Sequence, residues 1–185
     1  MPLTSGYVFC LYTATGFTIR GKKWDGSWGT QKATSNAVLG SNGYSAVNEG
    51  NDVHLCFVTG SNPDTVIYAK YSYASDSFEG ETTIQSSPNG GLPALSLETA
   101  TNTLYCFWRC YNNNTHIYYK RKNQAGDWDS SYADWIDEST DGLTAADRLT
   151  AFYKTYGRKI GLVYMTQTSS PNYKVNFVLL PHQAC

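Results

Sequence analysis

The sequence predicts an all-β protein, a β-propeller of about four blades. Three observations favour this class: short apolar runs joined by polar turns, a motif that returns every fifty residues, and a composition rich in aromatics but poor in charge. Aromatic residues make up 15% of the 185 residues and charged residues only 16%. Tyrosine and tryptophan favour strands because their rings pack well on a pleated surface. A Greek-key sandwich would also contain many short strands, but it does not require a constant repeat interval.

The first recurring element is an apolar run that carries a cysteine in three of its four copies. The copies are YVFCLYT (7–13), DVHLCFVT (52–59), TLYCFWRC (103–110) and KIGLVYMT (159–166). Aligning them places Cys10, Cys56 and Cys106 at one position of three blades, with Leu162 or Val163 in the fourth. This placement predicts small, buried and reduced side chains, and the five cysteines show no CxxC spacing of a zinc site.

A second apolar run follows each of these after a polar turn. The second runs are FTIRGKKW (17–24), TVIYAKYSY (65–73), THIYYKRKN (115–123) and YKVNFVLL (173–180). Gly, Asn, Asp and Pro in the intervening turns predict hairpins. An aromatic residue closes the next turn in three copies, at Trp28, Phe78 and Trp128. Because these three share one place in the repeat, we predict that they are structural anchors whose rings stabilise the blades.

A third run precedes the cysteine run, at 43–47, 91–97 and 148–153. A complete unit therefore holds four short strands, the content of a propeller blade. The predicted single domain, 1–185, divides into blades at approximately 1–40, 41–88, 89–140 and 141–185. The first and last units are incomplete. The propeller is thus either compact within one chain or completed by other sequence or a second copy, and open strand edges would favour such self-association.

The turns that end in an aromatic residue suggest a family. KKWDGSW keeps Asp25, Gly26 and Trp28, and YASDSF keeps Asp76 and Phe78. KNQAGDW keeps Gly126 and Trp128 but has no aspartate at the usual place. This set resembles the Asp-box or BNR repeat of sialidase-like β-propellers. The resemblance covers most of the chain at the level of blades and implies turns in which the aspartate caps backbone N–H groups.

The same resemblance raises the possibility of a sialidase, whose members share an arginine triad, a Tyr–Glu nucleophile pair and an acidic Asp. Three guanidinium groups would have to converge on one substrate carboxylate. The chain has five arginines, and no Arg-Ile-Pro stretch opens its first blade. A glycosidase also needs two carboxylates across the scissile bond, and no such pair stands out. We therefore favour a protein without catalytic residues, with a sialidase-type hydrolase as the alternative.

The favoured function is carbohydrate recognition, because tyrosine and tryptophan rings with little surrounding charge suit neutral sugars. The candidate ligand-binding residues are Trp135, Trp24, Tyr111 and Arg109. Trp135 is preferred because it stands in a polar segment, between Asp134 and Asp137. Trp108 was also considered, but its place in an apolar strand favours the core. A protein-interaction or adhesion scaffold is the second alternative.

Other partners are disfavoured by charge and pattern. The net charge of −1 gives no reason to expect nucleic acid, and no apolar run is long enough for a membrane span. The three histidines show no metal-ligand spacing, and no cofactor-binding motif is present, so neither a metal nor a cofactor is predicted. The first residues lack the pattern of a signal peptide, so secretion or display at the cell surface would require a leader outside this sequence.

Overall fold

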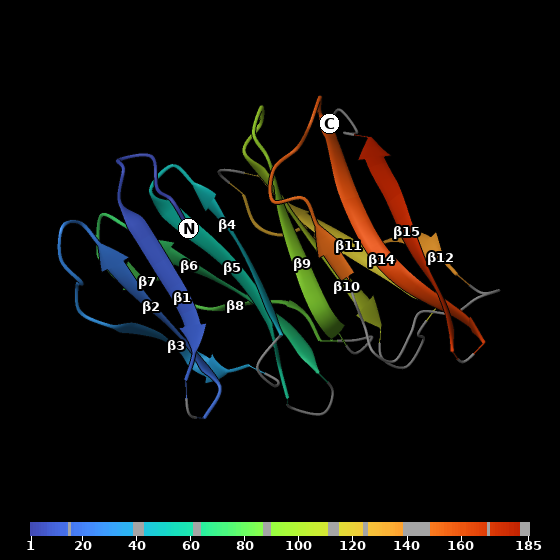
Figure 1. Cartoon of the computed structure of the whole chain (residues 1–185), viewed down its shortest axis with the longest axis horizontal. Coiled ribbons are helices and arrows are strands. Elements are labelled where there is room, and N and C mark those ends of the chain that lie inside the picture. The colour runs from blue at the N-terminus through green and yellow to red at the C-terminus, as the bar shows by residue number, and fades with distance from the viewer. Residues whose placement is uncertain are drawn as a thin grey trace.

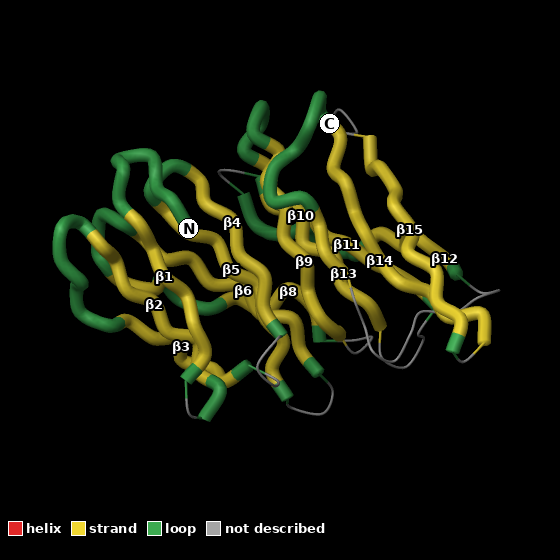
Figure 2. Tube along the Cα trace, viewed as in Figure 1, coloured by secondary structure: helices red, strands yellow, loops and turns green. Residues whose placement is uncertain are grey.

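The computed structural model describes residues 1–14, 16–38, 43–60, 64–86, 90–110, 115–123, 126–138, 149–169 and 171–181. These residues form strands and connecting turns, and no helix occurs among them (Figure 2). In particular, this part of the chain contains no helix that could cross a membrane. The protein is therefore all-β, as the sequence predicts.

The strands form four antiparallel sheets, each from one continuous stretch of chain. Blade 1 contains β1 (Val8–Thr13), β2 (Thr18–Trp24) and β3 (Lys32–Ala37). Blade 2 contains β4 (Tyr44–Glu49), β5 (Asp52–Thr59), β6 (Thr65–Ser72), β7 (Ser77–Phe78) and β8 (Thr82–Gln85). Blade 3 contains β9 (Gly90–Glu98), β10 (Thr103–Cys110), β11 (His116–Lys122) and β12 (Ala133–Asp137). Blade 4 contains β13 (Leu149–Ala151), β14 (Lys159–Ser169) and β15 (Asn172–Pro181).

Tight turns join sequential strands into hairpins. Between β13 and β14, Tyr156 pairs with Lys159 across two residues that both have positive φ, Gly157 at 55° and Arg158 at 62°. Positive φ at both central residues is the requirement of a type I′ turn, whose twist matches that of the flanking strands. Such turns explain why strands that follow one another in sequence also pair in space.

The four blades stand side by side in chain order, with blade 1 at one end and blade 4 at the other (Figure 1). We call the face of a blade that points toward the next blade its forward face, and the opposite face its backward face. Residues alternate between these faces along each strand. Because the forward face of one blade packs on the backward face of the next, the arrangement is that of β-propeller blades, and blades 1 and 4 are not paired in one sheet.

Apolar side chains fill the three interfaces between blades. Phe9 and Ile19 of blade 1 belong to clusters with residues of blade 2, including Val53, Leu55 and Phe57. The interface between blades 2 and 3 contains Cys56, Tyr68, Leu95, Cys106 and Trp108. The interface between blades 3 and 4 contains Phe107, Tyr119, Ile160, Leu162 and Leu180. Backbone hydrogen bonds between Leu97 and residues 153–155 also join β9 to blade 4.

The predicted alignment of the three cysteines is wrong by one residue in blade 2. A recurrent backbone hydrogen bond marks the equivalent positions, since the carbonyls of Lys23, Lys70 and Arg121 each accept an N–H from the residue after the anchor. These three residues pair across the hairpin with Phe9, His54 and Tyr105. The next residue in each strand is then Cys10, Leu55 and Cys106. Cys56 therefore lies on the forward face of blade 2, where its sulfur is 3.2 Å from that of Cys106 in blade 3.

The prediction of buried thiols is correct for Cys56 and Cys106 and wrong for Cys10. All three are free, but Cys10 is exposed, because no other blade of the described residues packs on the backward face of blade 1. The same cause gives the three predicted anchors different degrees of exposure. Phe78 and Trp128 are partly buried against the preceding blade, whereas Trp28 is 54% exposed.

Candidate functional site

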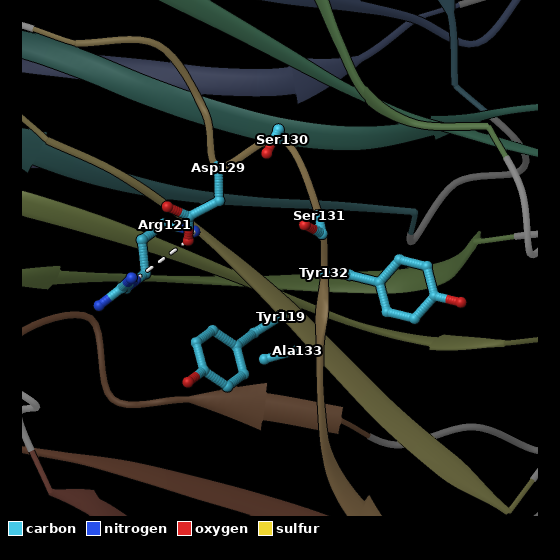
Figure 3. A pocket seen from close by; sticks show the side chains of 7 residues that line it. All are labelled: Tyr119, Arg121, Asp129, Ser130, Ser131, Tyr132 and Ala133. Carbon is cyan, nitrogen blue, oxygen red and sulfur yellow. Dashed lines mark hydrogen bonds and ion pairs between the residues drawn. The ribbon is translucent and has the colours of Figure 1, made fainter.

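A polar hollow lies on the outer half of blade 3, between β11 and the segment that leads into β12 (Figure 3). Its volume is about 310 Å³, at the lower end of the roughly 300–1,000 Å³ typical of small-molecule sites. We call it the blade 3 hollow. It is lined by Tyr119, Arg121, Asp129, Ser130, Ser131, Tyr132 and Ala133.

The turn after β11 places this segment. Lys122 and Trp128 form an isolated antiparallel bridge, and the Trp128 ring meets Tyr68 of blade 2 edge to face, with the ring centres 5.4 Å apart. The N–H of Asp129 then donates to the carbonyl of Arg121 at 2.8 Å. The aromatic anchor thus fixes where the chain leaves the turn, and the polar residues that follow it are held beside β11.

The charged centre of the hollow is an ion pair. The carboxylate of Asp129 accepts one hydrogen bond from the backbone N–H of Arg121 and another from its guanidinium Nε, each at 3.0 Å (Figure 3). Because the guanidinium and the carboxylate neutralise one another, the pair presents donors and acceptors without a net charge. A related pair, Lys70 and Glu79, stands at the equivalent place of blade 2 with 3.7 Å between Nζ and Oε1.

Two tyrosines line the hollow, Tyr119 from β11 and Tyr132 from the segment before β12. Tyr119 is almost fully buried and contacts Trp135, with ring centres 6.3 Å apart. The Tyr132 ring points away from Tyr119 and packs edge-on against Tyr118, with ring centres 4.8 Å apart. The lining of the hollow therefore combines two tyrosines with the ion pair and two serines.

The residues predicted from the sequence do not gather at one place. Trp135 is partly buried and packs on Phe107 and Tyr119, and it is not among the residues that line the blade 3 hollow. Trp24 lies on blade 1, where its ring meets that of Trp28 at 5.2 Å. Arg109 is buried in β10, and Tyr111 lies outside the described residues.

A second hollow, of about 220 Å³, lies on the backward face of blade 1. Its lining is Cys10, Tyr12, Lys22 and Trp28, which is mostly apolar apart from the lysine ammonium. The neighbouring Trp24 enlarges this aromatic surface. It differs from the blade 3 hollow because no carboxylate or serine lines it.

Charged residues near β12 form a separate cluster. His116 lies 2.8 Å from a carboxylate oxygen of Asp134 and 3.6 Å from one of Asp137. Within the described residues, no three His, Cys, Asp or Glu side chains come together in a way that could hold a metal ion. The histidine is therefore best read as a partner of the two acidic side chains.

The sequence contains a signal for the blade 3 hollow that does not involve a tryptophan platform. The run Asp129-Ser130-Ser131-Tyr132 follows an anchor directly and combines an acid, two hydroxyls and an aromatic ring. By its place in the strand, Arg121 resembles the lysines at neighbouring positions of other blades, such as Lys70. Only the pairing of Arg121 with Asp129 across the turn shows that the arginine belongs to a hollow.

Comparison with known proteins gives structural but no sequence relatives. No protein-family model and no curated protein sequence matches the chain. A protein of unknown function from Dyadobacter fermentans superposes with a TM-score of 0.67 at 12% identity, over 99% of this chain and 52% of that one. The Aleuria aurantia lectin, solved as the N224Q mutant with α-methyl-L-fucoside, gives 0.60 at 15% identity, over 95% and 56%.

A third similar structure is NanB with Optactamide, with a TM-score of 0.62 at 10% identity, covering 98% of this chain and 30% of that one. NanB is a sialidase from Streptococcus pneumoniae. The chain thus spans between about a third and just over half of the length of these three proteins. At such identities the likeness shows the fold alone: the chain has a propeller-like architecture shared by a lectin and a sialidase.

Proposed function

We propose that the chain is a non-catalytic carbohydrate-binding module and that the blade 3 hollow is its ligand site. The observation that carries the proposal is the Arg121–Asp129 pair beside two serine hydroxyls and a tyrosine wall. Sugars are recognised by planar donors and acceptors that bind hydroxyls and by aromatic rings that cover C–H faces. The fucoside complex of the structurally similar Aleuria lectin supports carbohydrate as the ligand class.

The charge balance favours a neutral sugar over an acidic one. A sugar carboxylate would compete with Asp129 for the Arg121 guanidinium, and separating the existing pair would cost part of the binding energy. A neutral hydroxyl can accept from the guanidinium and donate to the carboxylate without breaking the pair. This reasoning also disfavours the sialidase-type alternative, whose substrate carries a carboxylate.

The turns with Trp28, Phe78 and Trp128 belong to the same proposal as degenerate Asp-box repeats. One feature supports this: each anchor pairs back onto the preceding strand. In blade 2, Asp76 accepts a hydrogen bond from the Tyr71 hydroxyl at 2.6 Å. Asp76 binds a side chain where the family resemblance implies a capped backbone. The turn is therefore proposed to be held by this tyrosine in blade 2.

The test is direct binding to defined sugars. Isothermal titration with methyl glycosides of neutral hexoses and of L-fucose, and with N-acetylneuraminic acid for comparison, should show binding to a neutral glycoside. Arg121→Ala should weaken that binding roughly 10- to 100-fold, because a hydrogen bond from a charged group contributes about 1.5–3 kcal/mol. The matched control is Arg158→Ala, in the exposed turn before β14.

Three results would contradict the proposal in different ways. An absence of binding to every neutral glycoside and on a glycan array would favour the protein-interaction scaffold. Unchanged affinity in Arg121→Ala would place the ligand elsewhere on the molecule. Release of dye from a sialoside well above background would show that the protein is a hydrolase.

A further inference from the structure

The two end faces of the blade row are built like the faces that meet inside the molecule. The forward face of blade 4 carries Tyr173, Val175, Phe177 and Leu179, all of which are exposed, and Val175 reaches 70%. The backward face of blade 1 carries Val8, Cys10, Tyr12 and Trp24, with Trp28 beside them. Exposed apolar patches of this kind on a protein mark contact surfaces.

The residues of the first free face match residues that are buried elsewhere. The strands compared are β5 of blade 2, β10 of blade 3 and β14 of blade 4. The fifth residue of these strands is Cys56, Phe107 and Val163, respectively. Their partners across the hairpin are, in the same order, Tyr68, Tyr119 and Phe177. Tyr68 and Tyr119 are buried by the next blade, whereas Phe177 is 54% exposed.

The residues of the second free face match buried residues as well. Trp28 is the blade 1 counterpart of Trp128, whose ring rests on Tyr68 of the preceding blade at 5.4 Å. Phe78, the blade 2 counterpart, meets Phe9 of blade 1 at 6.4 Å. Lys22 is the counterpart of Lys120, which is buried at the interface between blades 2 and 3 and donates to the Ile84 carbonyl at 2.9 Å. The position of Lys22 is thus compatible with burial under a neighbouring blade.

From this correspondence we infer that a second copy of the chain docks head to tail, with the forward face of blade 4 on the backward face of blade 1. Phe177 of one copy would then meet Trp28 of the other in the way that Tyr68 meets Trp128. The occupant is a second copy because one copy presents one forward and one backward face, which is the combination used at all three interfaces inside the chain.

The blade count is compatible with a closed dimer. Two copies of four blades give eight, the upper end of the roughly four to eight blades found in propellers. In such a dimer both end faces of both copies are covered, and the second hollow of blade 1 lies inside the interface. An assembly that does not close would instead grow into longer species, since head-to-tail contacts propagate.

Sedimentation velocity on the full 185-residue chain tests the inference. We expect a dimer for the natural sequence and a monomer for Phe177→Asp and for Trp28→Asp, each weakening association roughly 30-fold or more, as for loss of a hot-spot residue. Tyr156→Asp is the matched control, because Tyr156 is exposed in the turn between β13 and β14, outside both faces. Cys10 should become protected from maleimide in the dimer and should react in the monomeric variants.

Mixing the two monomeric variants gives the decisive result. Trp28→Asp keeps an intact blade 4 face, and Phe177→Asp keeps an intact blade 1 face. The mixture should therefore form a one-to-one dimer through a single interface. A natural chain that stays monomeric up to its solubility limit would overturn the inference, as would failure of the mixture to associate. Val175→Lys replaces Phe177→Asp if circular dichroism shows that the latter is unfolded. Glycan binding at the blade 3 hollow is measured separately and does not depend on this outcome.

Discussion

Trp28 and Trp128 hold the same place in two blades but have different surroundings. Trp128 packs in the cluster between blades 2 and 3, against Tyr68. Trp28 contacts Trp24 at 5.2 Å on the free backward face of blade 1. Burial by a neighbouring blade therefore decides how far each ring contributes to stability, because the hydrophobic effect depends on the apolar area removed from water.

The two tryptophans should respond differently to truncation in the monomer. Trp128→Ala should lower the free energy of unfolding by about 3 kcal/mol, the low end of the range for buried aromatic residues, because the ring is only half-buried. Trp28→Ala should change it by less than about 1 kcal/mol. Urea unfolding of both variants in the Phe177→Asp background measures the difference. Equal losses would show that the two rings make comparable contacts.

His54 lies in a buried chain of hydrogen bonds between Tyr68 and Glu49. The Tyr68 hydroxyl is 2.7 Å from Nδ1, and Nε2 is 3.0 Å from a Glu49 oxygen. An ionised carboxylate only accepts, so Nε2–H donates to Glu49 and Nδ1 accepts from Tyr68. Burial lowers the pKa of His54 below its usual value, which is consistent with this neutral imidazole.

This shifted pKa predicts how stability depends on pH. The unfolded chain takes up a proton at His54 near pH 6.5, whereas the folded chain resists it until a lower pH. Stability should therefore be greatest above pH 6.5 and fall on acidification, by at most about 1.4 kcal/mol per pH unit from this group. Urea unfolding between pH 8 and pH 5 should show a shallower slope for His54→Gln. An identical slope in both proteins would mean that folding leaves the pKa of His54 unchanged.

At the scale of the element, the β1–β2 hairpin depends on a glycine beneath an aromatic ring. A Cβ atom added to Gly21 would lie 2.3 Å from Cζ of Phe9. Phe9 itself is fully buried and stacks on Tyr71 of blade 2, with 4.0 Å between the ring centres. In blade 2 the place of Gly21 is taken by Tyr68. Phe9 therefore supplies the ring that the glycine lacks, from the neighbouring strand.

Gly21→Ala should destabilise the protein by about 1–3 kcal/mol, the usual cost of overpacking a core. Gly80→Ala is the control, because nothing lies within 4 Å of its added Cβ and its φ is not in the positive range. Its stability should be unchanged or slightly raised, since alanine restricts the unfolded chain. Thermal unfolding followed by circular dichroism compares the two. If Gly21→Ala left the stability unchanged, the Phe9 ring would be able to move aside without cost.

The hairpins could be predicted because their signals are local. Apolar runs and turn residues lie next to one another in sequence, so the paired strands followed directly. Which residues of a strand point toward the preceding blade and which toward the next could not be predicted in the same way. Both faces of blades 2 and 3 are buried and apolar, so a one-residue shift leaves the pattern of Val53 to Val58 unchanged in character. The backbone hydrogen bonds of the folded chain show that Leu55, and not Cys56, is equivalent to Cys106 in the repeat.

The candidate site was harder to predict than the strands for a related reason. Arg121 and Asp129 are separated by a turn whose course depends on where Trp128 packs. That contact is with Tyr68 of another blade, about sixty residues earlier in the chain. Trp135 stands in a polar segment, as a sugar platform would, but its ring packs on Tyr119. Local composition cannot distinguish a ring at a surface from a ring behind it.

At the scale of the whole molecule, the inner blades are covered on both faces and the end blades on one. Interactions in such repeated structures are mainly between neighbours, so local stability should follow the number of covered faces. The β10–β11 hairpin belongs to the first group and β14–β15 to the second. Tyr119 of β11 is buried, whereas Phe177, at the corresponding position of β15, is half exposed.

Hydrogen exchange should reveal this difference in a monomeric protein. In Phe177→Asp, amides of β15 should exchange faster than amides of β11 after correction for intrinsic rates. Mass spectrometry of peptic peptides gives the measurement. In the natural dimer the same β15 amides should become slower, because the second copy covers them. Uniform exchange across all blades would show that the molecule opens only as a single unit.

Each blade is built from one continuous stretch of chain and packs on the blade made just before it. This order has a consequence for synthesis. As the chain leaves the ribosome, blade 2 finds blade 1 already complete, and each later blade meets a finished template. The strands of each sheet pair with strands of the same blade, so none has to wait for a distant partner. Assembly can therefore proceed in the direction of translation, one blade at a time.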